Sequence, residues 1–254
     1  AEILLCRTID MPRSYLFAHP EDELDDVTKS RFEEVLARRE AGTPMAYIMG
    51  VREFWSHEFV VSPATLVPRP ETELLVNLAL CEIPRDAEWR VLDLGTGSGA
   101  IAVSIACERP QSQVTAVDAS EEALAIAREN ARALAPGNVS CVAGSWTEPV
   151  RGREFNVIVS NPPYVRSDDD ALADLRHEPA MALVAGEDGL DAIRVLASDC
   201  GELLVDDGLL LIEHGADQAD DVAKLLEDNG WTAISCHNDL AGLPRVTAAR
   251  RGGK

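Results

Sequence analysis

Lysine is nearly absent from this sequence. Only three of its 254 residues are lysine, and 44 acidic side chains against 23 basic ones give a formal net charge of −21. Proteins that bind DNA or RNA usually do so with lysine and arginine, which displace counterions from the phosphate backbone. The composition therefore argues against direct nucleic-acid binding. It favours an acidic, soluble surface, a basic partner or adaptation to a salty cytoplasm.

Long apolar runs and paired metal or disulfide motifs are also missing. No apolar stretch reaches the roughly 18 residues that span a bilayer, and no signal-peptide pattern is present. The six cysteines form no Cys-x-x-Cys pair, so we interpret them as reduced and buried. The five histidines lack metal-ligand spacing, which predicts no metal site. We expect a cytoplasmic monomer without a membrane partner.

Apolar periodicity changes along the chain. It is helical up to about residue 42, including a helix from Val27 to Glu40, and β-rich from Ala46 to Val61. From Arg90 onward, short apolar strands alternate with helices, which predicts a doubly wound α/β sheet. Expected strands cover residues 91–94, 114–117, 139–142, 155–159, 209–212, 231–236 and 245–249. Expected helices cover residues 71–80, 100–108, 120–134, 188–204 and 216–228.

A glycine-rich loop follows the first strand of this alternating region. It reads Asp93-Leu94-Gly95-Thr96-Gly97-Ser98-Gly99 and opens a helix. Glycines let a backbone turn sharply and approach a ligand, and ligands of such sheets bind beyond the carboxyl ends of the strands. Asp118 ends the next strand, where its carboxylate can accept hydrogen bonds from both hydroxyls of a ribose. The pair predicts a nucleoside site, although a tight turn beside a surface aspartate remains an alternative.

A second loop, Ser160-Asn161-Pro162-Pro163-Tyr164, follows the strand that ends near Val159. Two prolines make it stiff, and a stiff loop can position a reacting group. An amide or aromatic amine is a poor nucleophile because its nitrogen lone pair is delocalised. The Asn161 side-chain oxygen and the Pro162 carbonyl can each accept one N–H, while Tyr164 can stack on the planar group. The loop predicts methyl transfer to such a nitrogen, of adenine, guanine or glutamine, and needs no tuned base.

The chain resembles one family almost throughout, over roughly residues 1–250. That family is the peptide chain release factor glutamine N5-methyltransferases (HemK/PrmC type), which are class I methyltransferases that use S-adenosylmethionine. Besides the two loops, the matching stretches are Gly42-Thr43-Pro44, Tyr47-Ile48-Met49-Gly50, Arg52-Glu53-Phe54-Trp55, the run from Phe59 to Glu73, Glu178-Pro179 with Ala182-Leu183, Gly189-Leu190, and Glu213-His214-Gly215. The stretch from Pro68 to Glu73 is the most family-specific part.

The resemblance implies a Rossmann-like, seven-stranded methyltransferase sheet and three domains. These are a helical domain at 1–43 that docks release factors, a β-hairpin linker at 44–70 and a catalytic domain at 71–254. Because the chain begins in a helical pattern without methionine, we expect further residues before it. The first domain is about one helix shorter than the family pattern.

The resemblance also implies residue roles. The acceptor would be the glutamine of the Gly-Gly-Gln motif of release factors, with S-adenosylhomocysteine as the second product. Asp93 and Asp118 would contribute to the cofactor site, with Trp146 beside the adenine unless it is a core aromatic. Ser145 stands where the family usually has an acidic residue. The loop residues are assigned as follows: Gly95, Thr96, Gly97, Ser98 and Gly99 to the cofactor, Asn161 to both ligands, Pro162, Pro163 and Tyr164 to the glutamine.

Two other functions remain possible at this stage. A nucleic-acid amine methyltransferase would share the Asn-Pro-Pro-Tyr loop, but the net charge and the lack of a basic recognition segment weigh against it. A non-catalytic cofactor-binding or ribosome-associated module would tolerate an eroded motif, yet Asp93, Asp118 and Asn161 are all present. The stretch from Pro68 to Glu73 is expected to wall the pocket, unless it serves only as a linker.

Overall fold

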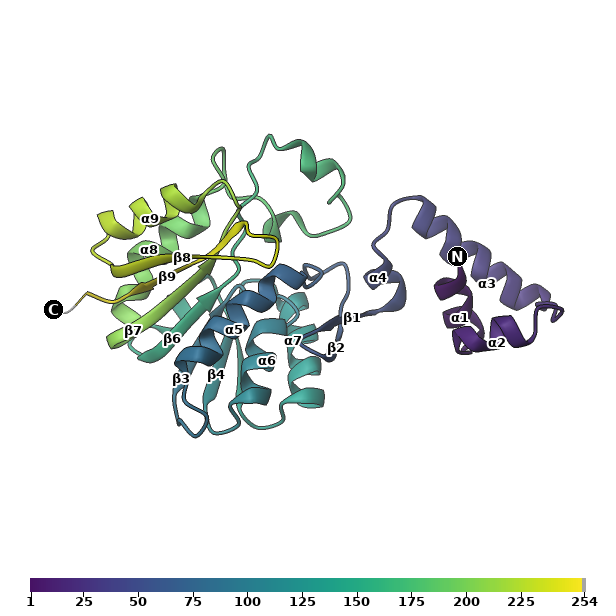
Figure 1. The fold of residues 1–254 in the computed structure, drawn as a ribbon, viewed down its shortest axis with the longest axis horizontal. Helices are drawn as coiled ribbons and strands as arrows, with labels where there is room; N and C mark the ends of the chain where they lie inside the picture. Colours follow the sequence, from purple (N-terminus) through teal and green to yellow (C-terminus); the bar gives the residue numbers. More distant parts are fainter. Residues whose placement is uncertain (253–254) are drawn as a thin grey trace.

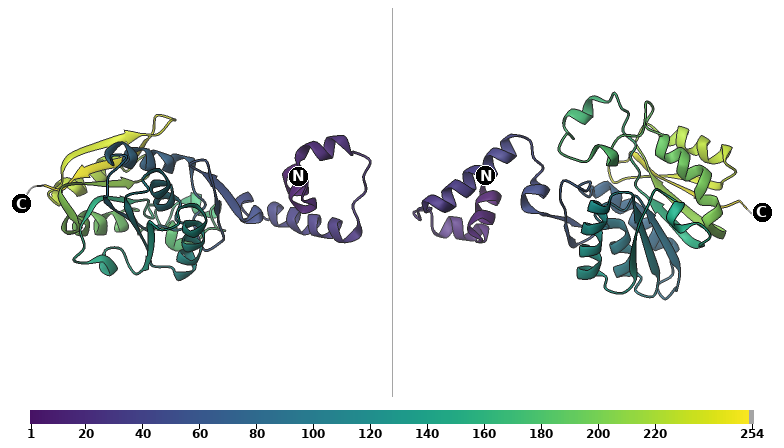
Figure 2. Two further views of the ribbon diagram at one scale, coloured as in Figure 1. Left: turned by 90° about the horizontal axis from the view of Figure 1, so that it is seen from below. Right: turned by 180° about the vertical axis from the view of Figure 1, so that it is seen from behind.

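A computed structural model describes residues 1–252. Its main body is an α/β sandwich, and the first helices stand apart from that body (Figures 1 and 2). The helices are α1 Glu2–Ile9, α2 Arg13–Ala18, α3 Asp26–Glu40, α4 Met45–Met49, α5 Glu73–Glu82, α6 Ala100–Glu108, α7 Glu121–Leu134, α8 Asp191–Leu203 and α9 Ala219–Asp228. Short 3₁₀ turns are η1 Pro70–Thr72, η2 Glu148–Val150, η3 Asp170–Ala173 and η4 Ala180–Ala182.

The strands form a two-stranded hairpin and a seven-stranded sheet. They are β1 Val51–Phe54, β2 His57–Val60, β3 Arg90–Leu94, β4 Gln113–Asp118, β5 Val139–Ala143, β6 Phe155–Ser160, β7 Leu204–Glu213, β8 Thr232–Asn238 and β9 Pro244–Arg250. The order in the large sheet is β5-β4-β3-β6-β7-β9-β8, and only β9 runs antiparallel to its neighbours. The predicted Rossmann-like methyltransferase sheet is confirmed.

Alternating side chains of the central strands bury both faces of the sheet. Val91 packs in one core cluster with residues of α5 and α6, whereas its neighbour Leu92 packs in the other with residues of α8 and α9. Residues pointing to opposite faces at a period of two explain why consecutive positions in these strands, such as Val91 and Leu92, are both apolar. In Figure 1, α5, α6 and α7 cover one face and α8 and α9 the other.

Most expected elements form within a few residues of their predicted bounds. Ser120, expected to cap α7, accepts a hydrogen bond from the Ala123 N–H. The prediction of a β-rich segment from Ala46 to Val61 was wrong at its start, because α4 occupies Met45–Met49 before β1. Pro44 precedes this helix and Gly50 ends it in the left-handed conformation (φ 76°). A single turn of helix is too short to show its periodicity.

Two further expectations need correction. The helix expected from residue 188 begins at Asp191, since Gly189 has a φ of 75° that helical backbone excludes. The cysteines are all free, but only Cys200 is buried, whereas Cys81 and Cys236 are exposed on the surfaces of α5 and β8. An apolar neighbourhood in sequence does not determine which way a helix or edge-strand residue points.

The N-terminal helices connect to the sheet through α4 and the β1–β2 hairpin (Figure 2). The predicted hairpin is present at Val51–Val60, while the division into domains at 43 and 70 stays a prediction. Among the described residues, no helix combines the length and apolar character needed to cross a bilayer.

Candidate active site

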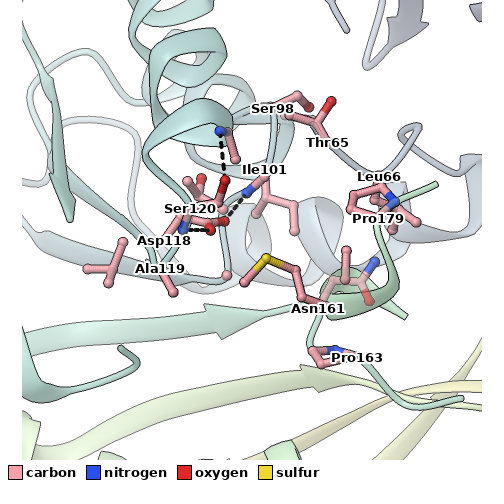
Figure 3. Close-up of a pocket in the computed structure, with 18 of the residues that line it drawn as sticks. Thr65, Leu66, Ser98, Ile101, Asp118, Ala119, Ser120, Asn161, Pro163 and Pro179 are labelled. Carbon is pink, nitrogen blue, oxygen red and sulfur yellow. Dashed lines mark hydrogen bonds between the residues drawn. The ribbon is translucent and has the colours of Figure 1, made fainter. Parts of the chain in front are cut away.

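A pocket of about 330 Å³ opens at the edge of the sheet where β3, β4, β5 and β6 end. Parallel strands bring their carboxyl ends together, so the loops after them meet here. Residues 64–72 and 179–182 complete its walls. Of the residues proposed from sequence, those that line it are Gly95, Thr96, Gly97, Ser98, Asp118, Trp146, Asn161 and Pro163. Figure 3 shows Asp118 and Asn161 on facing sides of this space.

The glycine loop forms one side of the pocket. Gly95, Gly97 and Gly99 all have positive φ angles, between 56° and 80°, which other residue types rarely adopt. The N–H groups of Gly95 and Thr96 both donate to the Val117 carbonyl oxygen, at 2.9 and 3.0 Å. These bonds tie the loop to the end of β4 and fix its path past the pocket.

Asp118 holds the same two segments together through its side chain. Its Oδ2 accepts from the Gly97 N–H at 2.8 Å and its Oδ1 from the Ser120 N–H at 2.9 Å, as drawn in Figure 3. A carboxylate has about four lone-pair sites. Each oxygen therefore keeps acceptor capacity for a hydroxyl group of a ligand.

Asp93 lies beneath the loop rather than on the pocket wall. It is fully buried, and its Oδ2 accepts from Thr96 Oγ1 at 2.6 Å and from the Ala102 N–H at 3.2 Å. Burial raises its pKa to about 7, and these two hydrogen bonds only partly offset that effect. Asp93 thus shapes the start of α6 and the loop above it.

The wall after β5 consists of Gly144, Ser145 and Trp146. The Trp146 ring lies against Gly95, because a Cβ added at Gly95 would sit 3.7 Å from the ring. Trp146 also packs at the margin of the core under β6 and β7. One side of the ring is therefore held by the protein while the residue also lines the pocket.

Asn161 follows β6 and is held in one orientation by a distant residue. Its Nδ2 donates to Oγ1 of Thr72 at 3.1 Å. With the amide nitrogen used in this way, the side-chain oxygen is left as the acceptor. The structure thus gives Asn161 the polarity needed to accept an N–H from a substrate.

Four residues proposed from sequence do not line the pocket within the described chain: Asp93, Gly99, Pro162 and Tyr164. Gly99 packs on α7, since a Cβ there would lie 3.2 Å from the Cβ of Ala127. Tyr164 is largely buried, and burial, with the nearby Glu213 charge, raises its pKa to about 12. Its backbone carbonyl accepts from Gln218 Nε2 at 3.1 Å, which fixes the loop.

An ion pair between the partly exposed Arg69 and the buried Glu178 joins the two segments that complete the pocket. Arg69 Nη2 lies 2.5 Å from Glu178 Oε1, and Glu178 Oε2 accepts from the Val67 N–H at 2.9 Å. Nearby, the Tyr47 hydroxyl donates to the Thr65 carbonyl at 2.5 Å. The linker after the hairpin is thereby pinned against the segment that follows the Asn-Pro-Pro-Tyr loop.

The pattern of residue types in the sequence gives no individual role to Thr72, Glu178 or Glu213. Each lies in a stretch quoted for the family resemblance, which was the available signal. Their partners are distant in the chain: 89 residues separate Thr72 from Asn161, and 111 separate Val67 from Glu178. Only the fold brings these groups together.

Family models match two parts of the chain. Residues 1–50 match the PrmC N-terminal domain, and residues 70–186 match the methyltransferase small domain. The two matches leave out mainly the hairpin and the last strands and helices.

Curated relatives match nearly the full chain. Proteins named release factor glutamine methyltransferase from Coxiella burnetii and Vibrio cholerae are 44% and 48% identical, over 99% and 97% of this chain. The matches cover 91% and 87% of those proteins. A third, from Pseudomonas aeruginosa, is 46% identical over 97% of this chain and 90% of its own length.

Solved structures share the fold at much lower identity. A methyltransferase from Pyrococcus furiosus superposes with a TM-score of 0.60 at 18% identity, over 87% of this chain and 100% of that one. A ribosomal protein L11 methylase from Lactobacillus delbrueckii gives 0.56 at 19% identity, over 76% and 84%. At these identities the likeness concerns the fold alone.

Proposed function

This chain belongs to the release factor glutamine methyltransferase family, and from that premise we propose that it methylates the glutamine of the Gly-Gly-Gln motif in peptide chain release factors. The methyl group comes from S-adenosylmethionine and goes to the side-chain nitrogen, N5. The observation that carries the proposal is the polarity of Asn161. Its side-chain nitrogen donates a hydrogen bond to Thr72, so its side-chain oxygen is available to accept from an amide N–H.

The pocket residues suit the proposed cofactor. Nothing lies within 4 Å of a Cβ built on Gly97, so this part of the loop leaves room for a ligand to approach the backbone. Asp118 has acceptor capacity for the ribose hydroxyls beyond its two loop bonds. We assign the methionine end to the Gly95–Gly99 loop and the adenine to the space beside Trp146, where Ser145 can accept from the adenine amino group. When bound, S-adenosylmethionine supplies a methyl group carried on a positively charged sulfur.

The chain's own residues orient the amide for reaction. Asn161 Oδ1 accepts one N–H of the glutamine side chain. The Pro162 backbone carbonyl, between the pocket-lining residues Asn161 and Pro163, accepts the other. Two fixed acceptors draw the nitrogen away from planarity and direct its electron density toward the methyl group. Once alkylated, the nitrogen releases a strongly acidic proton, so no base with a tuned pKa is required.

The proposed partner is the release factor, engaged without direct nucleic-acid contact. The net charge of −21 supports this choice, because it would oppose a phosphate backbone and attract a basic protein surface. The helical segment matching the PrmC N-terminal domain is the proposed docking element. We propose that the protein acts as a monomer in the cytoplasm, where translation terminates.

A substrate comparison tests this function. The protein is incubated with methyl-labelled S-adenosylmethionine and, separately, with purified release factor, DNA and ribosomal RNA. We expect label in the release factor only, and none when the Gly-Gly-Gln glutamine is replaced by alanine. Label in DNA or RNA but not in release factor would instead favour a nucleic-acid amine methyltransferase.

A further inference from the structure

Glu213 is a buried acid that the proposed chemistry does not yet use. It ends β7, directly beside the end of β6, where Ser160 pairs with Ile212. Its exposed fraction is 1%, and its Oε2 has no hydrogen-bond partner among the described residues. A buried carboxyl group without a hydrogen-bond partner destabilises the folded protein, so its presence calls for a functional explanation.

Two hydroxyl groups face this carboxyl. Those of Thr72 and Tyr164 lie close enough to lower the pKa of Glu213 by hydrogen bonding. Thr72 comes from η1, is 4% exposed, and accepts the hydrogen bond from Asn161 Nδ2 at 3.1 Å. Thr72 therefore contacts both the buried Glu213 and the pocket residue Asn161.

We propose that Glu213 is a positioning residue which, through the Thr72 hydroxyl, fixes the side-chain oxygen of Asn161 toward the substrate amide. The inference rests on the proposed function, because it assigns Glu213 to the same methyl-transfer site. It extends that function beyond the Asn-Pro-Pro-Tyr loop, to a residue on another strand.

The direction of the hydrogen bonds carries the argument. A threonine hydroxyl has one proton to donate and two lone pairs to accept with, whereas an ionised carboxylate only accepts. When Glu213 is ionised it accepts a hydrogen bond from the Thr72 hydroxyl, so Thr72 presents a lone pair to Asn161. Only the amide nitrogen can satisfy that lone pair, which leaves the oxygen facing the pocket.

A protonated or amide-bearing residue at position 213 removes this constraint. It can donate to Thr72, whose own proton is then free to point toward Asn161. The Asn161 amide can turn over to accept that proton, and its NH₂ group then faces the substrate NH₂. Donor against donor cannot orient the reacting nitrogen, so turnover falls while the cofactor site is unchanged.

The charged and titratable groups around Glu213 set the pH at which this happens. Burial raises the pKa of Glu213 to about 7, with Thr72, the Arg245 charge on β9 and Tyr164 lowering it and Glu71 on η1 raising it. The neighbouring His214 is engaged elsewhere, with Nε2 2.8 Å from Thr247 Oγ1. Ionisation of Glu213 therefore falls near neutral pH, and turnover should rise through that region.

The test compares Glu213→Gln, Thr72→Val and Thr72→Ser in the full-length protein with release factor as substrate. We expect both Glu213→Gln and Thr72→Val to lower kcat at pH 8 by on the order of 10- to 100-fold, the range seen when groups that orient a reacting-site ligand are removed. Thr72→Ser should recover most of that loss. Calorimetric affinity for S-adenosylhomocysteine should stay unchanged in Glu213→Gln, because Glu213 is not among the residues that line the pocket.

The pH profile and a control complete the experiment. The wild-type kcat should rise through about pH 7, whereas that of Glu213→Gln should not. Thr232→Val, an exposed substitution on β8, should match the wild type throughout. A wild-type kcat in both Glu213→Gln and Thr72→Val would overturn the inference. A loss of cofactor affinity in Glu213→Gln that parallels its loss of kcat would do the same. A wild-type protein inactive on release factor would refute the proposed function, and the inference with it.

Discussion

The backbone N–H of Gly97 donates to Asp118 Oδ2 at 2.8 Å, joining the loop after β3 to the end of β4. A single carboxylate therefore orders the glycine loop and offers its remaining lone pairs to the pocket. This arrangement makes the loop and the aspartate one unit. It predicts that a substitution in the glycine loop or at Asp118 should mainly reduce binding of the cofactor.

Replacing Asp118 with alanine should weaken binding of S-adenosylhomocysteine strongly. The two hydrogen bonds from the ribose hydroxyls to the charged Asp118 carboxylate would be lost, each worth roughly 1.5–3 kcal/mol. The Gly97 and Ser120 N–H groups would also lose their acceptor. Titration calorimetry measures the effect. Glu227→Ala, an exposed acid on α9, serves as the charge-matched control. An affinity that is the same in both variants would remove Asp118 from the site.

Gly97→Ala and Gly152→Ala form a matched pair. Both glycines have positive φ (56° and 77°), and at neither does an added Cβ meet anything within 4 Å. Left-handed backbone costs a residue with a side chain roughly 1–2 kcal/mol, so both variants should lose similar stability. Only Gly97 lines the pocket, so only Gly97→Ala should lose affinity for S-adenosylhomocysteine. Thermal unfolding and calorimetry separate the two effects, and equal affinities would contradict the assignment.

Asn161→Ala should leave cofactor binding largely intact and reduce turnover. Removing one preorganised polar group at a reacting centre typically costs on the order of 10²–10³ in rate. A labelled-methyl assay with release factor gives kcat, with Asn238→Ala on β8 as an exposed control. Near-normal turnover of Asn161→Ala would show that the amide nitrogen is oriented by other groups.

Asp93 should make the protein less stable as pH rises from about 4 to 7. Its folded pKa of about 7 lies above the ordinary value of 3.8 because of burial. The folded protein therefore holds more protons than the unfolded chain across this window, and stability falls as pH increases through it. Glu213, raised from 4.5 to about 7, acts in the same direction.

The comparison with Asp93→Asn isolates this effect, since the amide oxygen can still accept from Thr96 and Ala102. The net charge of −21 gives a background of the same sign, which the two proteins share apart from one charge. Melting temperatures between pH 5 and 8 should fall less steeply in the variant. Parallel curves would show that Asp93 titrates normally in the folded protein.

Local sequence predicted the parts of the site that lie within single loops. The glycine loop, Asp118 at a strand end and Asn161 in a stiff loop after a strand all appear where periodicity and loop chemistry placed them. It could not predict α4, whose five residues are too few to show a helical period. The stacking role of Tyr164 stays a prediction: this residue is not among those that line the pocket, and it lies near Glu213.

The remaining contacts depend on packing between distant segments. The Asn161–Thr72 bond and the Arg69–Glu178 pair join residues 89 and 109 positions apart. No periodicity or spacing relates such residues, because their proximity follows from the order of strands in the sheet and the path of the linker. The resemblance marked the stretches that contain them without showing which side chains meet.

Tandem mass spectrometry of release factor, after incubation with this protein and S-adenosylmethionine, tests directly whether the protein methylates the glutamine. We predict one added methyl group, located by fragmentation on the side chain of the Gly-Gly-Gln glutamine, and much less modification with Asn161→Ala under the same conditions. An unmodified glutamine, with a protein that still binds the cofactor, would contradict glutamine methylation. A methyl group found on another residue would contradict it as well.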